Sequence, residues 1–296
     1  MFKKATKQKQ KLRLLIEGAS GSGKTYSALL LAKGLAEKTG GKIALIDTEK
    51  GSASLYDTLV DFDVCEIEPD FTPEKYIKAI KEAEQAGYGI LIIDSISHEW
   101  SGKGGCLDIQ TALGGKFNDW AKVTPRHNAF IDTIISSNMH IIGTARTKTD
   151  YALEDGFNKS GGKTTKPVKV GLKTEQREGM DYEFTIVFRV NENHYATATK
   201  DRTSLFNGLD ETITPETGYK LFDWLNSGVE IKKPENKKGI DADFDIIQGL
   251  SAIEDIENVR KYYSENVKSV NDKEAFIEAC KRRKEALGHK EAEQIF

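Results

Sequence analysis

The sequence contains little cysteine, no long apolar run and no excess of positive charge. Its three cysteines, Cys65, Cys106 and Cys280, are far apart, and no CxxC or paired Cys/His spacing predicts a zinc site or a disulfide framework. No apolar run approaches the roughly 20 residues that a membrane span needs. The formal net charge of −3 excludes a global basic field, so a nucleic-acid partner would have to contact a local basic patch. These absences predict a soluble protein of a reducing compartment, without a membrane partner.

Apolar segments of strand length alternate with segments of helical periodicity over most of the chain. This alternation predicts an α/β fold, with a mostly parallel twisted sheet and helices on both faces. Two later β-rich segments, 183–190 and 194–200, predict an antiparallel hairpin at the sheet edge. The other expected strands cover residues 12–17, 42–48, 62–67, 88–94 and 139–145, and helices are expected over 24–38, 72–86 and from 124 onward.

The pattern changes near residue 226. We expect an α/β core over residues 1–226 and a polar linker over residues 227–240. Apolar residues then recur at helical spacing, which predicts a small helical module over residues 241–296.

A glycine-rich stretch between the first expected strand and the first expected helix fits the pattern GxxxxGK[ST]. This context favours a phosphate-binding loop, in which glycines let backbone N–H groups turn toward phosphate oxygens at a helix N-terminus. Lys24 is expected to reach the β- and γ-phosphates of ATP, and Thr25 to bind Mg²⁺. The alternative is a chance glycine-rich turn. The predicted nucleotide-binding residues are Gly18, Ala19, Ser20, Gly21, Ser22, Gly23, Lys24, Thr25 and Tyr26.

Two strand-end carboxylates are candidates for the chemistry. Asp94 ends a buried apolar run and is expected to hold Mg²⁺. Many ATPases of this kind place a glutamate directly after that aspartate, but the next residue here is Ser95. Glu49, at the end of the second strand, is therefore the candidate that activates water, provided that its strand lies beside the first strand. The alternative is that Glu49 is a solvated loop acid or pairs with Lys50.

Several short motifs resemble segments of RecA-like recombinases. IDTE (46–49) is similar to their catalytic strand end, and IIDSI (92–96) to their Mg²⁺ strand. GTARTK (143–148) with KSGGKTTK (159–166) is similar to their sensor strand and DNA-binding loop, and ATATKDR (196–202) to the segment that reaches a neighbour's ATP. More narrowly, the chain resembles the small core-only RecA-like ATPases of phages that infect Gram-positive bacteria. That resemblance rests on SHEWSGKGG (97–105), TPRHN (124–128), QREGMDYEF (176–184) and KDRTSLF (200–206).

The resemblance implies a RecA-like ATPase that assembles into a ring or filament and acts in phage recombination or single-strand annealing. It also implies the cytoplasm of the infected host, and a phage single-strand-binding or replication protein as a further partner. Lys200 and Arg202 follow a strand, and alternate residues of extended chain point the same way, so both can face one target. The resemblance implies that this target is a neighbour's ATP and that both act as catalytic cations. The alternative is an exposed basic turn that pairs with Asp201 or Asp210. Where RecA proteins usually carry a sensor glutamine this chain has Thr144, so either Thr144 or Arg146 is expected to relay the ATP state.

Residues 146–173 contain seven basic and three acidic residues. With four glycines, the segment is expected to be a flexible basic loop that follows the phosphates of single-stranded DNA. The alternative is a solvated loop without a partner. The expected DNA contacts are Arg146, Lys148, Lys159, Lys163, Lys166 and Lys169.

Other functions stay open on the sequence alone. One is a nucleotide-gated, non-catalytic adaptor of a phage replication or recombination complex, which measured ATP turnover would separate from an ATPase. Another is a helicase or packaging motor, which would translocate along DNA. A small-molecule kinase ranks last, because no arginine-rich lid is evident.

Overall fold

The computed structural model describes residue 4 and residues 6–157, 163–228, 250, 253, 255–268 and 273–293. The chain divides into two compact units, Met1–Glu230 and Ile231–Phe296, and each is described by itself. Within the described residues, no helix combines the length and the apolar character needed to cross a membrane.

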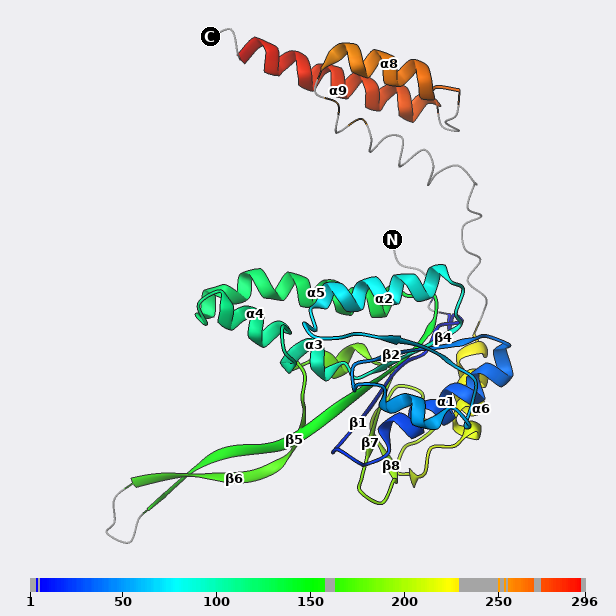
Figure 1. Cartoon of the computed structure of the whole chain (residues 1–296), viewed down its shortest axis with the longest axis vertical. Helices are drawn as coiled ribbons and strands as arrows, with labels where there is room; N and C mark the ends of the chain where they lie inside the picture. Colours follow the sequence, from blue (N-terminus) through cyan, green and yellow to red (C-terminus); the bar gives the residue numbers. More distant parts are fainter. Residues whose placement is uncertain are drawn as a thin grey trace. The chain divides into compact units, whose positions relative to one another are not determined.

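The first unit is built on one mostly parallel sheet with the strand order β3-β2-β4-β5-β1-β7-β8-β9 (Figure 1). Strands β3, β2, β4, β5, β1 and β7 pair in parallel, and β8 and β9 extend the sheet antiparallel. A further strand, β6, pairs only with β5. The bounds are β1 Arg13–Gly18, β2 Ile43–Asp47, β3 Asp63–Glu66, β4 Ile90–Asp94, β5 His140–Phe157, β6 Lys163–Thr174, β7 Ile186–Val190, β8 Ala196–Asp201 and β9 Asp210–Glu211.

Helices cover both faces of this sheet, because strand side chains alternate between two cores (Figure 1). Leu14 and Ile16 pack in the core beneath α1 (Lys24–Thr39) and α6 (Pro215–Asn226). Leu15 belongs to the opposite core, which includes side chains of α2 (Pro73–Gln85) and α5 (Trp120–Ser136). The predicted α/β class, with a mostly parallel sheet, helices on both faces and an antiparallel edge, is confirmed. Shorter elements are η1 Ser52–Tyr56, α3 Ser97–Ser101, α4 Cys106–Ala112, η2 Phe117–Asp119 and η3 Met180–Glu183.

One predicted helix start is wrong. The sequence places it at residue 124, with a proline at the first helical position, but α5 begins at Trp120 and Pro125 lies inside it. The 3-10 turn η2 leads directly into α5, so the helix is already under way at the proline. Pro125 lacks an N–H group, which removes one bond near the start of the helix without ending it.

Two glycines let α1 and α6 pack closely. A Cβ atom on Gly34 would lie 2.0 Å from the Pro215 carbonyl oxygen, and one on Gly218 would lie 2.6 Å from that of Leu31. Helix propensity alone predicts that Gly34→Ala stabilises the protein by about 0.5–1 kcal/mol. The close contact instead predicts a loss of about 1–3 kcal/mol in the free energy of unfolding. Urea denaturation decides the sign, and an unchanged or raised stability would contradict this packing.

His140 makes the stability of this unit depend on pH. The backbone N–H of Leu12 donates to its Nδ1 at 3.1 Å, which requires a neutral ring. Burial, assisted by Lys11 and Arg13, lowers the pKa of His140 to about 3. The unfolded chain takes up this proton near pH 6.5, so the contribution is complete above pH 6.5 and is lost as the pH falls toward 3.

We therefore expect His140→Asn to reduce the loss of unfolding free energy between pH 7 and pH 5 by on the order of 1–2 kcal/mol. Urea denaturation of both proteins over this range measures the effect. If the unfolding free energies of the two proteins change with pH in parallel, the His140 ring does not titrate as described.

The second unit contains α8 (Ile256–Asn266) and α9 (Lys273–Glu293). Val259, Phe276 and Cys280 are buried between them, and Tyr263 stacks on Phe276 with ring centroids 5.8 Å apart. Both helices fall within the segment for which the sequence predicts a helical module. The predicted linker lies outside the described residues from residue 229 onward.

Candidate nucleotide site and basic hairpin

The glycine-rich loop joins the end of β1 to the start of α1. Gly21 and Gly23 have φ angles of 78° and 88°, a left-handed conformation that favours glycine. The Ser22 hydroxyl is buried and has no hydrogen-bond partner. A buried unpaired hydroxyl beside a helix N-terminus is a place where an anionic ligand fits, so the loop is compatible with a phosphate group.

The side chains of Thr25 and Asp94 are in contact, which is compatible with a shared Mg²⁺ ion. The Thr25 hydroxyl donates to Asp94 Oδ2 at 2.6 Å, and the Thr144 hydroxyl donates to Asp94 Oδ1 at 2.5 Å. Burial raises the pKa of the Asp94 carboxyl, and these two hydrogen bonds oppose that shift. A hydroxyl and a carboxylate supply the oxygen ligands that Mg²⁺ prefers. Lys24 Nζ meanwhile donates to the Ala19 carbonyl oxygen at 2.7 Å, where a phosphate would offer a charged acceptor.

A cavity of about 460 Å³ lies over the loop. Its walls include Tyr26 and Tyr56, whose rings pack edge to face with centroids 5.8 Å apart. His194, from the turn between β7 and β8, also lines it, and its Nδ1 lies 2.9 Å from the Ser22 carbonyl oxygen. The sequence identifies Tyr26 but not Tyr56 or His194, because their position depends on which distant segments fold over the loop.

The prediction of which strand lies beside β2 is wrong. The sequence hypothesis requires β2 to lie beside β1, but β5 and β4 separate them. Apolar runs predict that a strand lies inside the sheet, but they do not determine its neighbours. The carboxyl ends of β2 and β4 still meet at one edge, where Asp47 is in register with Asp94.

Glu49 is held by Arg146. The guanidinium makes two bonds to the carboxylate, from Nε to Oε1 at 3.1 Å and from Nη2 to Oε2 at 2.5 Å. The Ser95 hydroxyl donates to Oε1 at 3.4 Å, and His98 Nε2 lies 4.0 Å from that oxygen. The ion-pair partner is thus Arg146, and not Lys50, the partner named in the alternative to a catalytic role. Asp47 does not pair with Arg146 in this way. Its Oδ1 accepts a hydrogen bond from the backbone N–H of Glu49 at 2.5 Å, which stabilises the turn after β2.

Glu49 acts electrostatically on Lys24, the lysine predicted to bind phosphate, but does not line the cavity over the loop. Burial lowers the pKa of Lys24, and the carboxylates of Asp94 and Glu49 oppose that shift, so their fields reach the ammonium group. Glu49 and Arg146 instead line a neighbouring cavity of about 360 Å³, together with His98 and Phe71. The structure therefore places the predicted water-activating group beside the phosphate site and in contact with an arginine.

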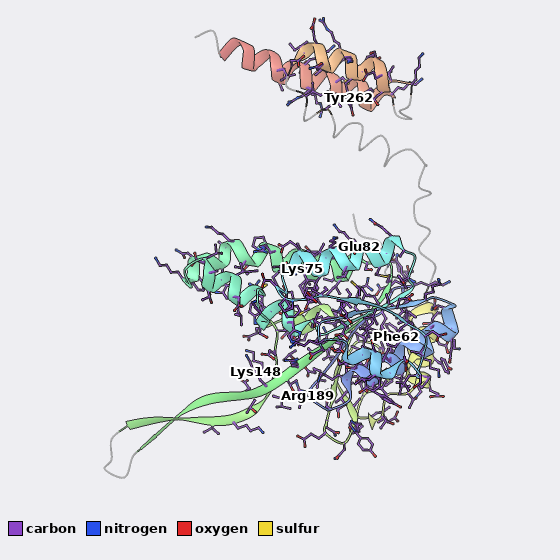
Figure 2. All side chains as sticks on the ribbon, in the orientation of Figure 1. Phe62, Lys75, Glu82, Lys148, Arg189 and Tyr262 are labelled. Atoms are coloured by element: carbon purple, nitrogen blue, oxygen red, sulfur yellow. The ribbon has the colours of Figure 1, made fainter. Side chains whose placement is uncertain are left out.

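The predicted basic loop is a β-hairpin. From Thr147, β5 leaves the sheet and pairs antiparallel with β6 as an arm that projects from the unit (Figure 1). The many threonines and valines of this segment favour extended structure over a loop, despite its glycines. Lys148 and Lys169 are exposed on this arm, and Figure 2 marks Lys148 on it. Lys163 and Lys166 belong to β6 but their side chains lie outside the described residues, as does Lys159 entirely.

Lys200 and Arg202 share one orientation, as predicted. Lys200 Nζ donates to the Tyr182 carbonyl oxygen at 2.6 Å, and Arg202 Nη2 donates to the same oxygen at 2.8 Å. Lys200 is in register with Val187, which pairs with Leu15 near the amino end of β1. The phosphate loop lies at the carboxyl end of β1, so neither cation is placed on the phosphate loop of its own chain.

Comparison with known proteins agrees with this geometry. A family model described as an AAA domain matches residues 10–214, more than half of the chain and the whole of the site. The chain belongs to this AAA-domain family. AAA domains are P-loop ATPase modules, so membership implies a bound nucleotide and usually Mg²⁺, with which the loop, Thr25 and Asp94 are compatible.

A solved structure similar to this AAA-domain chain is the KaiC-like protein PH0186 from Pyrococcus horikoshii OT3. The two sequences are 14% identical, and the match covers 67% of this chain and 82% of that chain with a TM-score of 0.39. Among curated proteins, none matches the chain.

Proposed function

We propose that this AAA-domain chain is an ATP- and Mg²⁺-dependent ATPase that binds single-stranded DNA and acts in phage recombination or annealing. The observation that carries the proposal is the two-bond contact between Arg146 and Glu49. It connects the base of a basic hairpin to a carboxylate whose electrostatic field reaches Lys24. The resemblance to RecA-like phage ATPases supports the biological setting.

Each residue of the site is proposed to have one role in ATP hydrolysis. The loop of residues 18–26 holds the phosphates, and Lys24 exchanges the Ala19 carbonyl for phosphate oxygens. Thr25 and Asp94 hold Mg²⁺, which neutralises charge on the phosphates when bound. Glu49 accepts a proton from the attacking water. While both its oxygens accept hydrogen bonds from Arg146, the carboxylate is engaged by the guanidinium instead of the attacking water, and hydrolysis is slow.

Single-stranded DNA is proposed to release Glu49. The Arg146 side chain is 41% exposed at the base of the hairpin, so a DNA phosphate can compete with Glu49 for its guanidinium. The same strand carries Thr144, which bonds Asp94, so a movement of β5 acts on both carboxylates. This arrangement uses Thr144 and Arg146 together as the sensor.

Assembly is proposed to complete the site. Lys200 and Arg202 face away from their own phosphate loop, which supports a role on the ATP of a neighbouring copy in a ring or filament. A cation supplied in this way accelerates phosphoryl transfer by about 10³ to 10⁵. The helical second unit is proposed to recruit a phage single-strand-binding or replication protein.

The test is an ATPase titration of the full chain with and without single-stranded DNA, repeated at several salt concentrations. We expect DNA to raise turnover, and this stimulation to weaken steeply as salt rises. Turnover that DNA does not change would overturn the proposal. If ATP binds but no turnover occurs even with DNA, the chain is a nucleotide-gated adaptor. The ion pair that Glu49 makes with Arg146 is compatible with that function as well.

The hairpin makes a separate prediction. Replacing both Lys148 and Lys169 with alanine is expected to weaken single-stranded DNA binding and to reduce the slope of log affinity against log salt by about 1 to 1.5, or about 0.7 per lost contact. Fluorescence anisotropy with a labelled oligonucleotide measures this. Basal turnover should stay unchanged. Lys220→Ala, an exposed lysine on α6, is the control; equal losses in both variants would remove the hairpin from the DNA site.

A further inference from the structure

Three buried side chains of different chemistry meet on three different helices. Glu99 of α3 and Cys106 of α4 have no exposed surface, and His127 of α5 is 3% exposed. Cys106 Sγ lies 3.1 Å from Glu99 Oε1, and His127 Nδ1 lies 3.1 Å from the same oxygen. One ligand atom from each residue lies within 4.8 Å of the other two.

These separations suit a tetrahedral metal ion. Zinc bonds to sulfur at about 2.3 Å and to nitrogen or oxygen at about 2.0–2.2 Å, so ligand atoms on one ion are about 3.3–3.6 Å apart. Thiolate, imidazole and carboxylate are all zinc ligands. A Zn²⁺ ion with one thiolate and one carboxylate is electrically neutral, which lowers the free-energy cost of burying the charges.

The surroundings orient these ligands. Gln176 Nε2 donates to Glu99 Oε2 at 3.2 Å and to the Ile96 carbonyl oxygen at 2.9 Å, which holds the carboxylate. Oε1 faces Cys106, and His127 Nδ1 lies 3.1 Å from Oε1 and 3.2 Å from Oε2. Hydrogen bonds of this kind, made by residues behind the ligands, tune metal affinity. The Trp100 ring packs edge-on against His127 with centroids 5.4 Å apart, which helps to fix the orientation of the imidazole.

We propose that Glu99, Cys106 and His127 bind one Zn²⁺ ion, with water at the fourth position. Binding replaces the thiol proton of Cys106, which leaves to solvent. The neutral His127 ring then binds through Nδ1 and carries its proton on Nε2. The ion links α3, α4 and α5 beside the end of β4. The cysteine and histidine spacing in the sequence predicts no such site, because the three helices meet only in the folded chain.

The test uses the full chain after treatment with a chelator, titrated with Co²⁺ as a spectroscopic substitute for Zn²⁺. We expect one equivalent to bind, with visible bands of tetrahedral cobalt and a near-ultraviolet thiolate-to-cobalt charge-transfer band. Cys106→Ser should lose the charge-transfer band. Cys65→Ser and Cys280→Ser, which change cysteines elsewhere in the chain, should keep it. Elemental analysis of the purified chain should find one zinc per chain.

A second measurement tests the proposal even if Cys106→Ser does not fold. Zn²⁺ should raise the melting temperature of the chelator-treated protein, and Glu99→Gln, whose amide is a poor ligand but fills the same space, should lose most of that increase. Absence of any stoichiometric metal and of any cobalt spectrum would overturn the proposal. So would a charge-transfer band that persists in Cys106→Ser.

Discussion

Replacing Glu49 with glutamine is expected to lower DNA-stimulated ATP turnover by about 10² to 10³-fold, within the range for the loss of a general base. Glutamine keeps the size of the side chain but cannot accept a proton at neutral pH. ATP affinity should stay near the wild-type value, because the residues proposed to hold the phosphates are unchanged. Phosphate release gives the turnover, and a fluorescent ATP analogue gives the affinity.

Glu68→Gln is the matched control for this variant. Glu68 lines the same cavity as Glu49 and is exposed, so the same chemical change is made a short distance away. Its turnover should equal that of the wild type. If Glu49→Gln hydrolyses ATP as fast as Glu68→Gln, Glu49 is not the group that activates water.

The second large effect concerns Arg146. Its replacement by glutamine is expected to raise turnover in the absence of DNA by several-fold to about tenfold, because Glu49 is freed from a partly exposed ion pair worth about 1 kcal/mol. DNA should then stimulate the variant less than the wild type. Steady-state turnover with and without DNA measures both changes. Arg146→Lys keeps the charge but cannot make the two-bond contact, and should fall between the two proteins.

The opposite result has a distinct meaning. If Arg146 binds the γ-phosphate and promotes hydrolysis, Arg146→Gln lowers turnover with and without DNA. Lys148→Gln serves as the comparison, because Lys148 lies on the same strand, farther along the arm. Lys148→Gln should weaken DNA binding and leave basal turnover unchanged. A change in basal turnover that only Arg146→Gln shows therefore comes from the ion pair with Glu49 and not from the loss of a DNA contact.

The local part of the site is predictable from the sequence. The loop of residues 18–25 and the strand ending at Asp94 are continuous segments, and their motifs predict the turn, the following helix and the buried strand end. The hydrogen bond between Thr25 and Asp94 agrees with that prediction. It forms because the parallel strands β1 and β4 both end at the same edge of the sheet. Lys200 lies near the end of β8 and Arg202 directly follows it, and both reach the Tyr182 carbonyl oxygen, as the two-residue repeat of extended chain predicts.

Long-range neighbours are not predictable in this way. Nothing within residues 43–49 indicates that β4 and β5 lie between β2 and β1, so the contact of Glu49 with Arg146 emerges only from the strand order. The position of His194 against the loop depends likewise on the turn between β7 and β8. In the hairpin, glycine and lysine content suggests a loop, whereas the backbone of β5 from Thr147 onward pairs with β6 along its length, in a segment whose threonines and valines favour extended structure.

The most direct test of the account is a structure of the full chain with Mg²⁺, a non-hydrolysable ATP analogue and single-stranded DNA. We expect the Glu49 carboxylate to have left Arg146 and to lie one water molecule away from the terminal phosphate. A complex in which Glu49 still holds Arg146, while another side chain positions the water, would contradict the account.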